Sequence, residues 1–258
     1  MGNTETVCGL YIADELKARL RMTTTPGATP DDLLIKLRGM LAKNKFAPDD
    51  IDGAIISSVV PELTDSWRKA AATIANADAL IVSSECCDGL KLKFDNPDAL
   101  GADRIADVVG AIGLYGVPVI VIDMGTATNI EVIDKRGVYV GGIIAPGMET
   151  SANALFKSAA RIGRFDIEAS TGVIGKDTAQ SVQAGIVDGE ADRIDGLVKR
   201  IFDELGYHAR VVATGGLARH VADLSHTIDD VNDDLTLEGL RRIYLRTVIP
   251  SLTGNLPR

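Results

Sequence analysis

One pattern of turn and strands occurs twice in this chain, and it constrains the fold more than any other feature. The second copy reads VIVIDMGTATNIEVIDKRGVYVGGII (residues 119–144), and the first reads MGNTETVCGLYIADELKARLRMTT (residues 1–24). When Gly2 is aligned with Gly125, each copy has a hydroxyl-rich glycine turn that leads into two apolar strands. Few letters are shared, but a repeated layout of this kind indicates duplication of one supersecondary unit. The sequence therefore predicts an internally duplicated fold.

The two copies differ in front of the glycine. The second copy has a leading apolar strand, residues 118–122, followed by Asp123, which stands two residues before Gly125; in the first copy only Met1 precedes Gly2. The leading strand of such a unit normally lies inside the sheet, and its loss leaves buried backbone groups unpaired at about 1–3 kcal/mol each. We therefore expect that a first strand is missing from this sequence. The alternative is a shortened N-terminus in which residues 7–12 pair elsewhere.

The rest of the chain alternates helices with short apolar runs. Apolar residues at helical spacing predict helices near residues 33–41, 63–74, 105–112, 152–159, 178–205 and 237–244. Short apolar runs predict strands at 53–57, 79–82, 118–122 and 209–213, and a polar turn joins two more strands at 128–134 and 138–144. Bounded apolar runs between helices indicate a largely buried sheet covered by helices. The sequence therefore predicts an α/β fold.

Charge and cysteine content exclude several classes of function. The net charge of −9 disfavours nucleic acid and anionic membranes as partners, because both require clustered cations. No apolar run is long enough for a transmembrane helix. The three cysteines, Cys8, Cys86 and Cys87, and the three histidines lack metal-site spacing. This pattern predicts a cytoplasmic protein with neither a structural disulfide nor a zinc site.

The turn DMGTAT has the composition of a phosphate-binding turn. Asp123 follows a buried strand and would project at its carboxyl end, where ligands of open α/β sheets bind. Gly125 allows a phosphate to approach the backbone, and Thr126 and Thr128 can donate hydrogen bonds. The alternative is a simple strand-ending turn, but the recurrence of the turn at Gly2 favours a function. Gly2, Asn3 and Thr4 would then form the first phosphate motif.

Three further segments are ambiguous when each is taken alone. The segment Gly101-Ala102-Asp103-Arg104 opens a helix, and an acidic residue there is favoured by the helix dipole whatever its function. Thr178 begins the long helical stretch and has the side chain of an N-cap residue. Gly215 and Gly216 follow an apolar strand and suit either a loop that passes over a flat base or an ordinary connection to a helix.

Taken together, these motifs resemble one known family. GNTET, GADR, DMGTAT, GGIIAPG, VIGKDT and ATGGLA occur in the order seen in type III pantothenate kinases, over essentially the whole chain. The resemblance implies the fold of the acetate and sugar kinase, chaperone ATPase and actin superfamily, with two RNase H-like domains and ATP between them. It implies an N-terminal domain over residues 1–116 and a C-terminal domain over residues 117–258. The implied reaction is ATP-dependent phosphorylation of pantothenate at its 4′-hydroxyl, towards coenzyme A.

The resemblance also implies roles for individual residues. Asp103 would be the general base, Arg104 would hold the substrate carboxylate, and Asp123 would act at a metal ion. Pantothenate would also be bound by Gly101, Ala102 and Thr178. The nucleotide would be bound by Gly2, Asn3, Thr4, Gly125, Thr126, Thr128, Gly215 and Gly216. The implied cofactors are ATP, Mg²⁺ and a monovalent cation, K⁺ or NH₄⁺, and the implied assembly is a homodimer that completes the pantothenate pocket.

Two departures from the family pattern keep other functions open. The first phosphate motif lacks the aspartate two residues before its glycine, and Phe94 stands where the family commonly has a tyrosine that helps to hold pantothenate. A non-catalytic regulator that binds nucleotide or pantothenate is therefore one alternative. A related kinase for a sugar or an acid is another, although GADR together with VIGKDT argues against it.

Overall fold

The computed structural model describes residues 1–83, 91–93, 96, 100–159, 162, 167–168 and 172–248. Phe94, Cys86 and Cys87 lie outside these residues. The chain forms two compact units: unit 1 comprises residues 1–90, 95–113 and 236–258, and unit 2 comprises residues 91–94 and 114–235. The domain boundary expected between residues 116 and 117 stays a prediction.

Unit 2 is built on a six-stranded sheet with the strand order β10-β9-β6-β7-β8-β5. Its central strand, β6 (Val119–Met124), pairs antiparallel with β7 (Ala127–Ile133) and parallel with β9 (Arg210–Thr214). The outer strands are β5 (Lys91–Leu92), β8 (Val138–Pro146) and β10 (Asp230–Val231). The three strands expected between residues 118 and 144 are therefore confirmed, in the predicted order.

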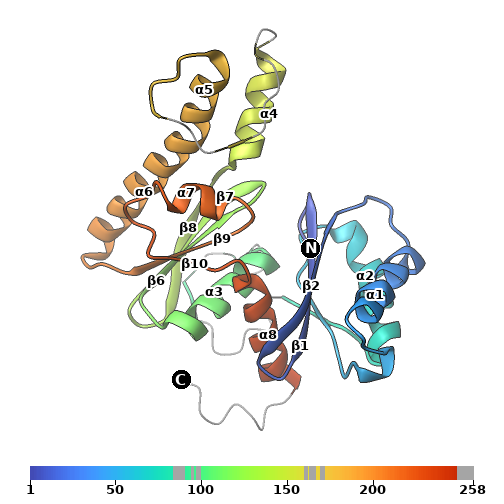
Figure 1. Ribbon diagram of the computed structural model, residues 1–258. Coiled ribbons are helices and arrows are strands. Elements are labelled where there is room, and N and C mark those ends of the chain that lie inside the picture. Colours follow the sequence, from blue (N-terminus) through green and yellow to red (C-terminus); the bar gives the residue numbers. More distant parts are fainter. Residues whose placement is uncertain are drawn as a thin grey trace. The chain divides into compact units, whose positions relative to one another are not determined.

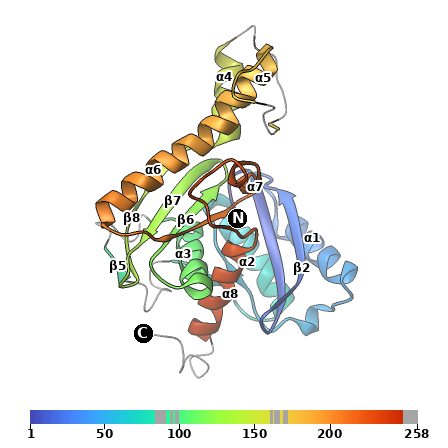
Figure 2. The same ribbon diagram turned by 60° about the vertical axis from the view of Figure 1, so that its left-hand side comes forward.

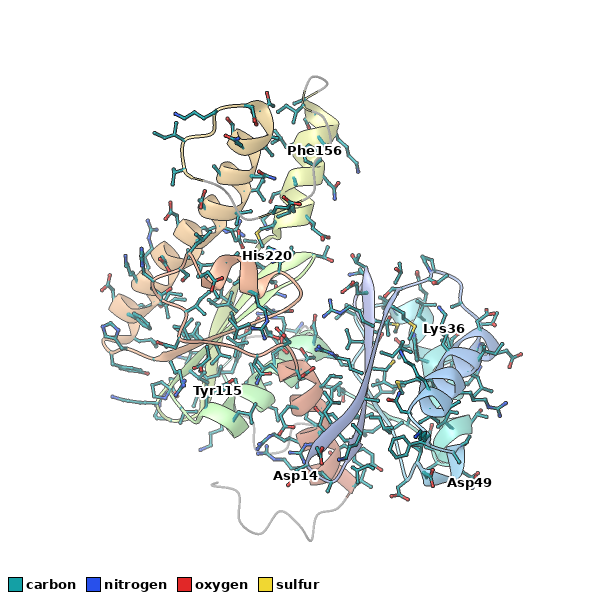
Figure 3. All side chains as sticks on the ribbon, viewed as in Figure 1. Asp14, Lys36, Asp49, Tyr115, Phe156 and His220 are labelled. Atoms are coloured by element: carbon teal, nitrogen blue, oxygen red, sulfur yellow. The ribbon has the colours of Figure 1, made fainter. Side chains whose placement is uncertain are left out.

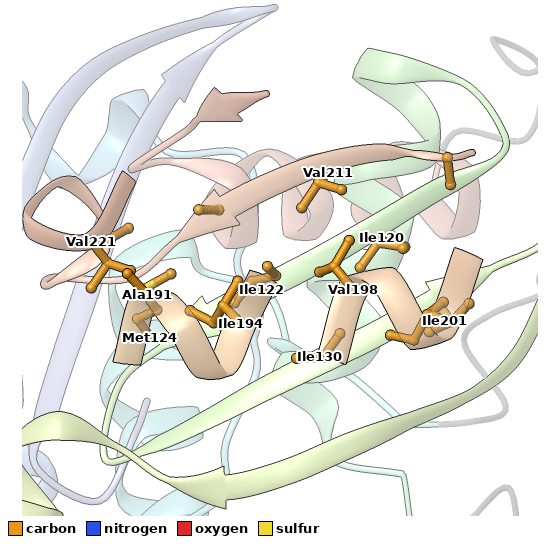
Figure 4. Close-up of a cluster of buried hydrophobic side chains, with 14 of the residues drawn as sticks. Ile120, Ile122, Met124, Ile130, Ala191, Ile194, Val198, Ile201, Val211 and Val221 are labelled. Carbon is orange, nitrogen blue, oxygen red and sulfur yellow. The ribbon is translucent and has the colours of Figure 1, made fainter. Parts of the chain in front are cut away.

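A long helix, α6 (Gly189–Leu205), covers one face of this sheet (Figures 1 and 2). Ile194, Val198 and Ile201 recur at helical spacing and pack on Ile120 and other residues of the sheet (Figure 4). The helix ends at Gly206, whose φ of 75° is the left-handed conformation that glycine adopts at helix ends. Removing these side chains from water is the main stabilising contribution within unit 2.

The helical stretch predicted over residues 178–205 is continuous in the structure and changes its winding once. It consists of α5 (Thr178–Gln183), a π-helical segment (Ala184–Asp188) and α6. Together with α4 (Met148–Ser158), α5 extends beyond the end of the sheet (Figures 1 and 2). The predicted helical stretch is therefore confirmed, and the π-helical segment within it is a feature that apolar periodicity does not register. The short helix α7 (Ala218–Ala222) completes unit 2.

Unit 1 contains two separate pairs of strands. The strands β1 (Glu5–Ile12) and β2 (Glu15–Thr23) form an antiparallel hairpin, which confirms the predicted pair after Gly2. The strands β3 (Ile55–Ile56) and β4 (Leu80–Ile81) pair in parallel and are shorter than the apolar runs that predict them. Among the residues that the structure describes, these two pairs do not join into one sheet.

Two helices cover one face of the hairpin in unit 1. α1 (Pro30–Lys43) begins at Thr29, whose hydroxyl accepts a hydrogen bond from the backbone N–H of Asp32 while the Asp32 carboxylate accepts one from Thr29 N. α2 (Pro61–Ala75) has its first residue at a proline, as the sequence indicates. Leu33 of α1 packs with Leu63 and Trp67 of α2 in a buried cluster.

Helices α3 (Ala102–Tyr115) and α8 (Leu235–Val248) approach each other closely within unit 1. A Cβ atom on Gly239 would lie 1.8 Å from the backbone oxygen of Ala106. Beside this contact, the Thr236 hydroxyl donates a 2.5 Å hydrogen bond to the buried Asp107 carboxylate. Further along α8, Arg241 donates a 2.7 Å hydrogen bond to Asp14 in the β1–β2 turn (Asp14 is labelled in Figure 3). These contacts hold the C-terminal helix in unit 1.

The close contact between α3 and α8 predicts the effect of substituting Gly239. Gly239→Ala should lower the free energy of unfolding by about 1–3 kcal/mol, because the new methyl group collides with a backbone oxygen that cannot move away. Gly196→Ala on the exposed side of α6 is the matched control, since its Cβ would meet no described atom within 4 Å. It should raise stability by about 0.5–1 kcal/mol through helix propensity. Urea unfolding followed by circular dichroism measures both, and equal effects would contradict the packing argument.

Candidate active site

The turn between β6 and β7 is shaped by close backbone contacts. Gly125 N donates a 2.9 Å hydrogen bond to Ala127 O, and Gly147 N donates one of 3.1 Å to Thr126 O. A Cβ on Gly147 would lie 2.2 Å from Gly125 O, so a larger residue at position 147 would push the turn away. The Thr150 hydroxyl also donates to Thr126 O, at 2.6 Å. The start of α4 therefore holds this turn in place.

A second loop of unit 2 meets the same end of the sheet. Gly215 follows β9, has φ +96°, and a Cβ there would lie 2.4 Å from Met124 O and 2.8 Å from the Asp123 carboxylate. Because β6 and β9 are parallel and pair Asp123 with Thr214, their carboxyl ends coincide. The structure thus brings together Asp123, the turn at Gly125 and the loop at Gly215, three features predicted as parts of a nucleotide site.

The Thr128 hydroxyl has a partner inside the protein. It donates a 2.6 Å hydrogen bond to the buried Glu190 carboxylate, from the first turn of α6. Glu190 also pairs with Arg193, whose guanidinium donates to Pro146 O at 3.0 Å. Neither Glu190 nor Arg193 is predicted from the sequence as a site residue. Their spacing of three residues on a helix is the only local signal, and it is common on helix surfaces.

The turn of the first repeat copy has a related but longer form. Gly2 N donates a 2.8 Å hydrogen bond to Glu5 O, one residue further along than the bond made by Gly125. Gly2 O accepts a 2.7 Å hydrogen bond from the Thr24 hydroxyl, and Thr24 N donates to Thr4 O at 2.9 Å. The predicted first phosphate motif is therefore an ordered turn that precedes β1 and is hydrogen-bonded to Thr24, the residue after β2.

Asp103 lies at the start of α3, as predicted, and its carboxylate folds back along the chain. Its Oδ1 accepts a 2.8 Å hydrogen bond from Arg104 N, and a Cβ on Gly101 would lie 2.5 Å from the same oxygen. Burial lowers the pKa of the Met1 ammonium, and the charges of Cys8 and Asp103 partly oppose that shift. Asp103 therefore lies near the turn at Gly2, within unit 1.

Thr178 lies in a different setting, at a pocket of unit 2 with a volume of about 620 Å³. The pocket is formed by the end of α4, the segment 175–178, α5 and the π-helical segment. Asp177, not Thr178, is the N-cap of α5, because its Oδ1 accepts a 2.8 Å hydrogen bond from Gln180 N. The lining includes Lys176 and Thr178 but not the residues of the phosphate turn.

The described part of the chain lacks two kinds of feature. Among those residues, no group of three or more histidine, cysteine, aspartate or glutamate side chains could hold a metal ion. No helix there is long and apolar enough to cross a membrane.

Solved structures of known proteins share this fold. One is component A of (R)-2-hydroxyglutaryl-CoA dehydratase from Acidaminococcus fermentans, with a TM-score of 0.57, 15% identity and coverage of 98% of this chain and 97% of that chain. Another is the activator of 2-hydroxyisocaproyl-CoA dehydratase from Clostridium difficile, solved with bound ADPNP, with a TM-score of 0.55, 17% identity and coverage of 100% and 97%. These likenesses confirm the predicted duplicated, actin-like ATPase fold.

Sequence comparison identifies the family. The sequence model of type III pantothenate kinase matches residues 1–200. A type III pantothenate kinase from Agathobacter rectalis is 39% identical over 95% of this chain and 94% of its own length. Those from Thermomicrobium roseum and Roseiflexus sp. are 41% and 42% identical, each over 95% of this chain and 95–96% of their own lengths. The motifs, the duplicated fold and these relatives agree: this chain belongs to the type III pantothenate kinase family.

Proposed function

We propose that this protein transfers the terminal phosphoryl group of ATP to the 4′-hydroxyl of pantothenate, the first step of coenzyme A biosynthesis. The observation that carries the proposal is 39–42% identity to type III pantothenate kinases over nearly the whole chain. Phosphoryl transfer depends mainly on positioning and charge neutralisation, so the relevant groups are those that hold phosphate, cation and acceptor. We also propose a cytoplasmic location, because ATP is the cosubstrate.

The nucleotide contacts that we propose in unit 2 come largely from backbone. The turn at residues 125–128 and the loop at Gly215 and Gly216 are the candidate phosphate and adenosine contacts. Support comes from the close approach of Gly215 to Met124 O, which leaves no room for a side chain. Because the Thr128 hydroxyl donates to Glu190, we assign to Thr128 the role of fixing the turn through that buried bond.

Asp123 is our candidate ligand for Mg²⁺, with a monovalent cation, K⁺ or NH₄⁺, at the same phosphates. Magnesium in phosphoryl-transfer sites is usually held by one or two carboxylates together with substrate phosphates and water. A single carboxylate at the carboxyl end of β6, beside the candidate phosphate turn, fits that donor set. When bound, the cations would neutralise negative charge on the triphosphate.

Asp103 and Arg104 are our candidates for the acceptor side of the reaction. Asp103 would take the proton of the pantothenate hydroxyl, and its hydrogen bond to Arg104 N supports a fixed orientation of its carboxylate. Arg104 would pair with the pantothenate carboxylate through its planar guanidinium. Gly101, Ala102, Phe94 and Thr178 remain candidate substrate contacts.

We also propose that the protein acts as a homodimer. Val173 and Ile174, beside the pocket that contains Thr178, are 77% and 78% exposed in the single chain. Large apolar side chains next to one another on a surface favour a protein–protein contact. Gly185 lines the same pocket, and a Cβ there would meet no described atom within 4 Å, which leaves room for the backbone of a partner chain.

The proposed activity is tested by measuring phosphopantothenate formation from ATP and pantothenate, with sugars and short hydroxy acids as alternative acceptors. Turnover should require pantothenate. Preferred turnover of another acceptor would identify a related kinase instead. Binding of ATP or pantothenate without turnover of any acceptor would favour a non-catalytic regulator.

Replacement of Asp103 tests the candidate base. Asp103→Asn should lower kcat by about 10²–10⁴-fold, because the amide cannot accept the proton, while ATP binding should be unchanged. Asp31→Asn is the matched control, since Asp31 is also an acidic residue in the first turn of a helix and is exposed on α1. Steady-state kinetics and nucleotide titration measure both effects. A kcat near that of the parent protein would remove Asp103 from the role of base.

Replacement of Arg104 tests the carboxylate contact. Arg104→Lys should raise KM for pantothenate by about 10–100-fold, because lysine keeps the charge but loses the paired donors. The KM for ATP should change little. Arg38→Lys, at an exposed position of α1, is the control. An increase confined to KM for ATP would mean that Arg104 serves the nucleotide.

A further inference from the structure

The first turn of α6 contains an ion pair that contacts two strands of the unit 2 sheet. Glu190 is 5% exposed, and its carboxylate accepts a 2.6 Å hydrogen bond from the Thr128 hydroxyl of β7. The same carboxylate pairs with Arg193, three residues further along the helix. Nη2 of Arg193 also donates a 3.0 Å hydrogen bond to Pro146 O, at the end of β8. One ion pair therefore joins α6 to both β7 and β8.

The apolar face of α6 explains why this pair lies where the helix meets the sheet. Ala191 and Ile194 belong to the buried cluster on the sheet, and both are labelled in Figure 4. Glu190 and Arg193 directly precede them, so each lies about 100° around the helix from a buried residue. A carboxylate at such a border loses water and needs charged or hydrogen-bonding partners in the protein. Glu190 has both kinds of partner.

Both contact points of the ion pair adjoin the candidate phosphate turn. Thr128 is the second residue of β7, directly after the turn. Pro146 is followed by Gly147, whose N–H donates to Thr126 O and whose Cβ, if present, would lie 2.2 Å from Gly125 O. The ion pair therefore holds the strand that leaves the turn and, through Pro146, the segment that presses on it.

The bond from Thr128 to Glu190 limits what the Thr128 side chain can do for a ligand. A threonine hydroxyl has one proton, and here that proton is donated to the carboxylate. Thr128 is also only 2% exposed. While this bond exists, the Thr128 hydroxyl cannot donate to a phosphate oxygen. Its effect on a bound nucleotide must therefore come through the position of the backbone in the turn.

The charge of Glu190 also matters for an anionic ligand. A carboxylate beside the turn repels a triphosphate, and water screens that repulsion poorly when the carboxylate is buried. Arg193 supplies the opposite charge directly at the carboxylate. Arg193 thus makes the bond to Pro146 O and removes net negative charge from the neighbourhood of the turn.

We propose that Glu190 and Arg193 are positioning residues of the nucleotide site. They act on the triphosphate through Thr128, through Pro146 and through their paired charges, without contacting it. Glu190 fixes the position of residues 125–128, and Arg193 keeps the charge beside them neutral. This inference rests on the proposed function in one respect, that the turn at Gly125 is the phosphate contact. An ion pair with a structural role alone would change stability but not nucleotide affinity.

A double-mutant cycle tests whether Glu190 acts through Thr128. Glu190→Met and Thr128→Val should each weaken binding of the ATP analogue ADPNP with Mg²⁺ by about tenfold, because each removes one partner of a buried charged hydrogen bond. The double variant should bind no more weakly than either single variant. Isothermal titration calorimetry measures the affinities. A loss of about a hundredfold in the double variant would overturn the proposal, because the two residues would then act independently.

Thr128→Ser is the conservative variant in this cycle. It keeps the hydroxyl and should bind ADPNP as the parent protein does. If Glu190→Met does not fold, the comparison of Thr128→Ser with Thr128→Val still decides, because equal affinities of these two variants would overturn the proposal.

Asp195→Asn is the control for stability. Asp195 is also a buried carboxylate of α6, but it accepts hydrogen bonds from Ser225 and Thr227 and does not contact the turn. Its replacement should lower the midpoint of urea unfolding and leave ADPNP affinity unchanged. Loss of ADPNP affinity in Asp195→Asn equal to that in Glu190→Met would overturn the proposal, because any loosening of α6 would then be enough.

A second cycle tests the charge of the pair. Arg193→Met leaves the Glu190 carboxylate without its cation and should weaken ADPNP binding by about tenfold or more. Adding Glu190→Gln to Arg193→Met removes the remaining charge and should recover at least threefold of that loss. If the double variant binds no better than Arg193→Met, neutralisation by Arg193 would be excluded.

Steady-state kinetics separates this inference from the proposed function. Glu190→Met should raise KM for ATP and leave KM for pantothenate within about twofold of the parent value. If the parent protein binds ADPNP but forms no phosphopantothenate, the proposed function is contradicted, and the binding cycles still decide the inference. Absence of ADPNP binding by the parent protein would overturn both.

Discussion

The hydrogen bonds that β6 makes on both of its edges are the constraint on which unit 2 depends. Each residue of this strand is bonded to β7 on one side or to β9 on the other, and the apolar side chains of Ile120 and Ile122 are completely buried. Buried backbone groups must be paired, because an unpaired group costs about 1–3 kcal/mol. The strand therefore has one position and one register. Its carboxyl end, with Asp123 and Gly125, is fixed by the same bonds that stabilise the sheet.

Steric exclusion then shapes the turn that follows. Gly147 and Gly215 come so close to the backbone of residues 124–125 that neither position has room for a Cβ atom. Glu190 accepts a hydrogen bond from the Thr128 hydroxyl and Arg193 donates one to Pro146 O, so α6 is connected to β7 just after the turn and to the end of β8. Rigid backbone N–H groups at a strand end suit an anionic ligand, because little ordering remains to be done when the ligand binds.

The sequence predicts the repeated features of this protein well and its long-range contacts poorly. The hairpins after Gly2 and Gly125 follow from duplication, and the helices α1, α2 and α6 follow from apolar spacing and terminal residues. The association of α8 with α3 depends on Gly239 and Thr236, whose partners lie more than a hundred residues away, as the 129-residue separation of Thr236 from Asp107 illustrates. No local pattern records such a pair.

The candidate site shows the same contrast between local features, which the sequence predicts, and tertiary contacts, which it does not. Asp123, Gly125 and Gly215 were identified because strand ends and glycines are visible in sequence, and the parallel pairing of β6 with β9 brings them together. A cap role was one of two readings left open for Thr178, and the structure gives that role to Asp177, because both side chains suit a cap and only backbone geometry distinguishes them. Glu190 was missed because its importance arises from burial beside Thr128, which is a tertiary property.

The π-helical segment at Ala184–Asp188 has a consequence for how the end of unit 2 is oriented. A wide turn holds one residue more than a regular α-helical turn, which offsets the faces of the flanking helices by about 100°. The face of α6 that carries Ile194 and Val198 is thereby out of phase with the side of α5 that borders the pocket. Deleting one residue from the segment would therefore turn α5, with Thr178 at its start, by about 100° relative to α6.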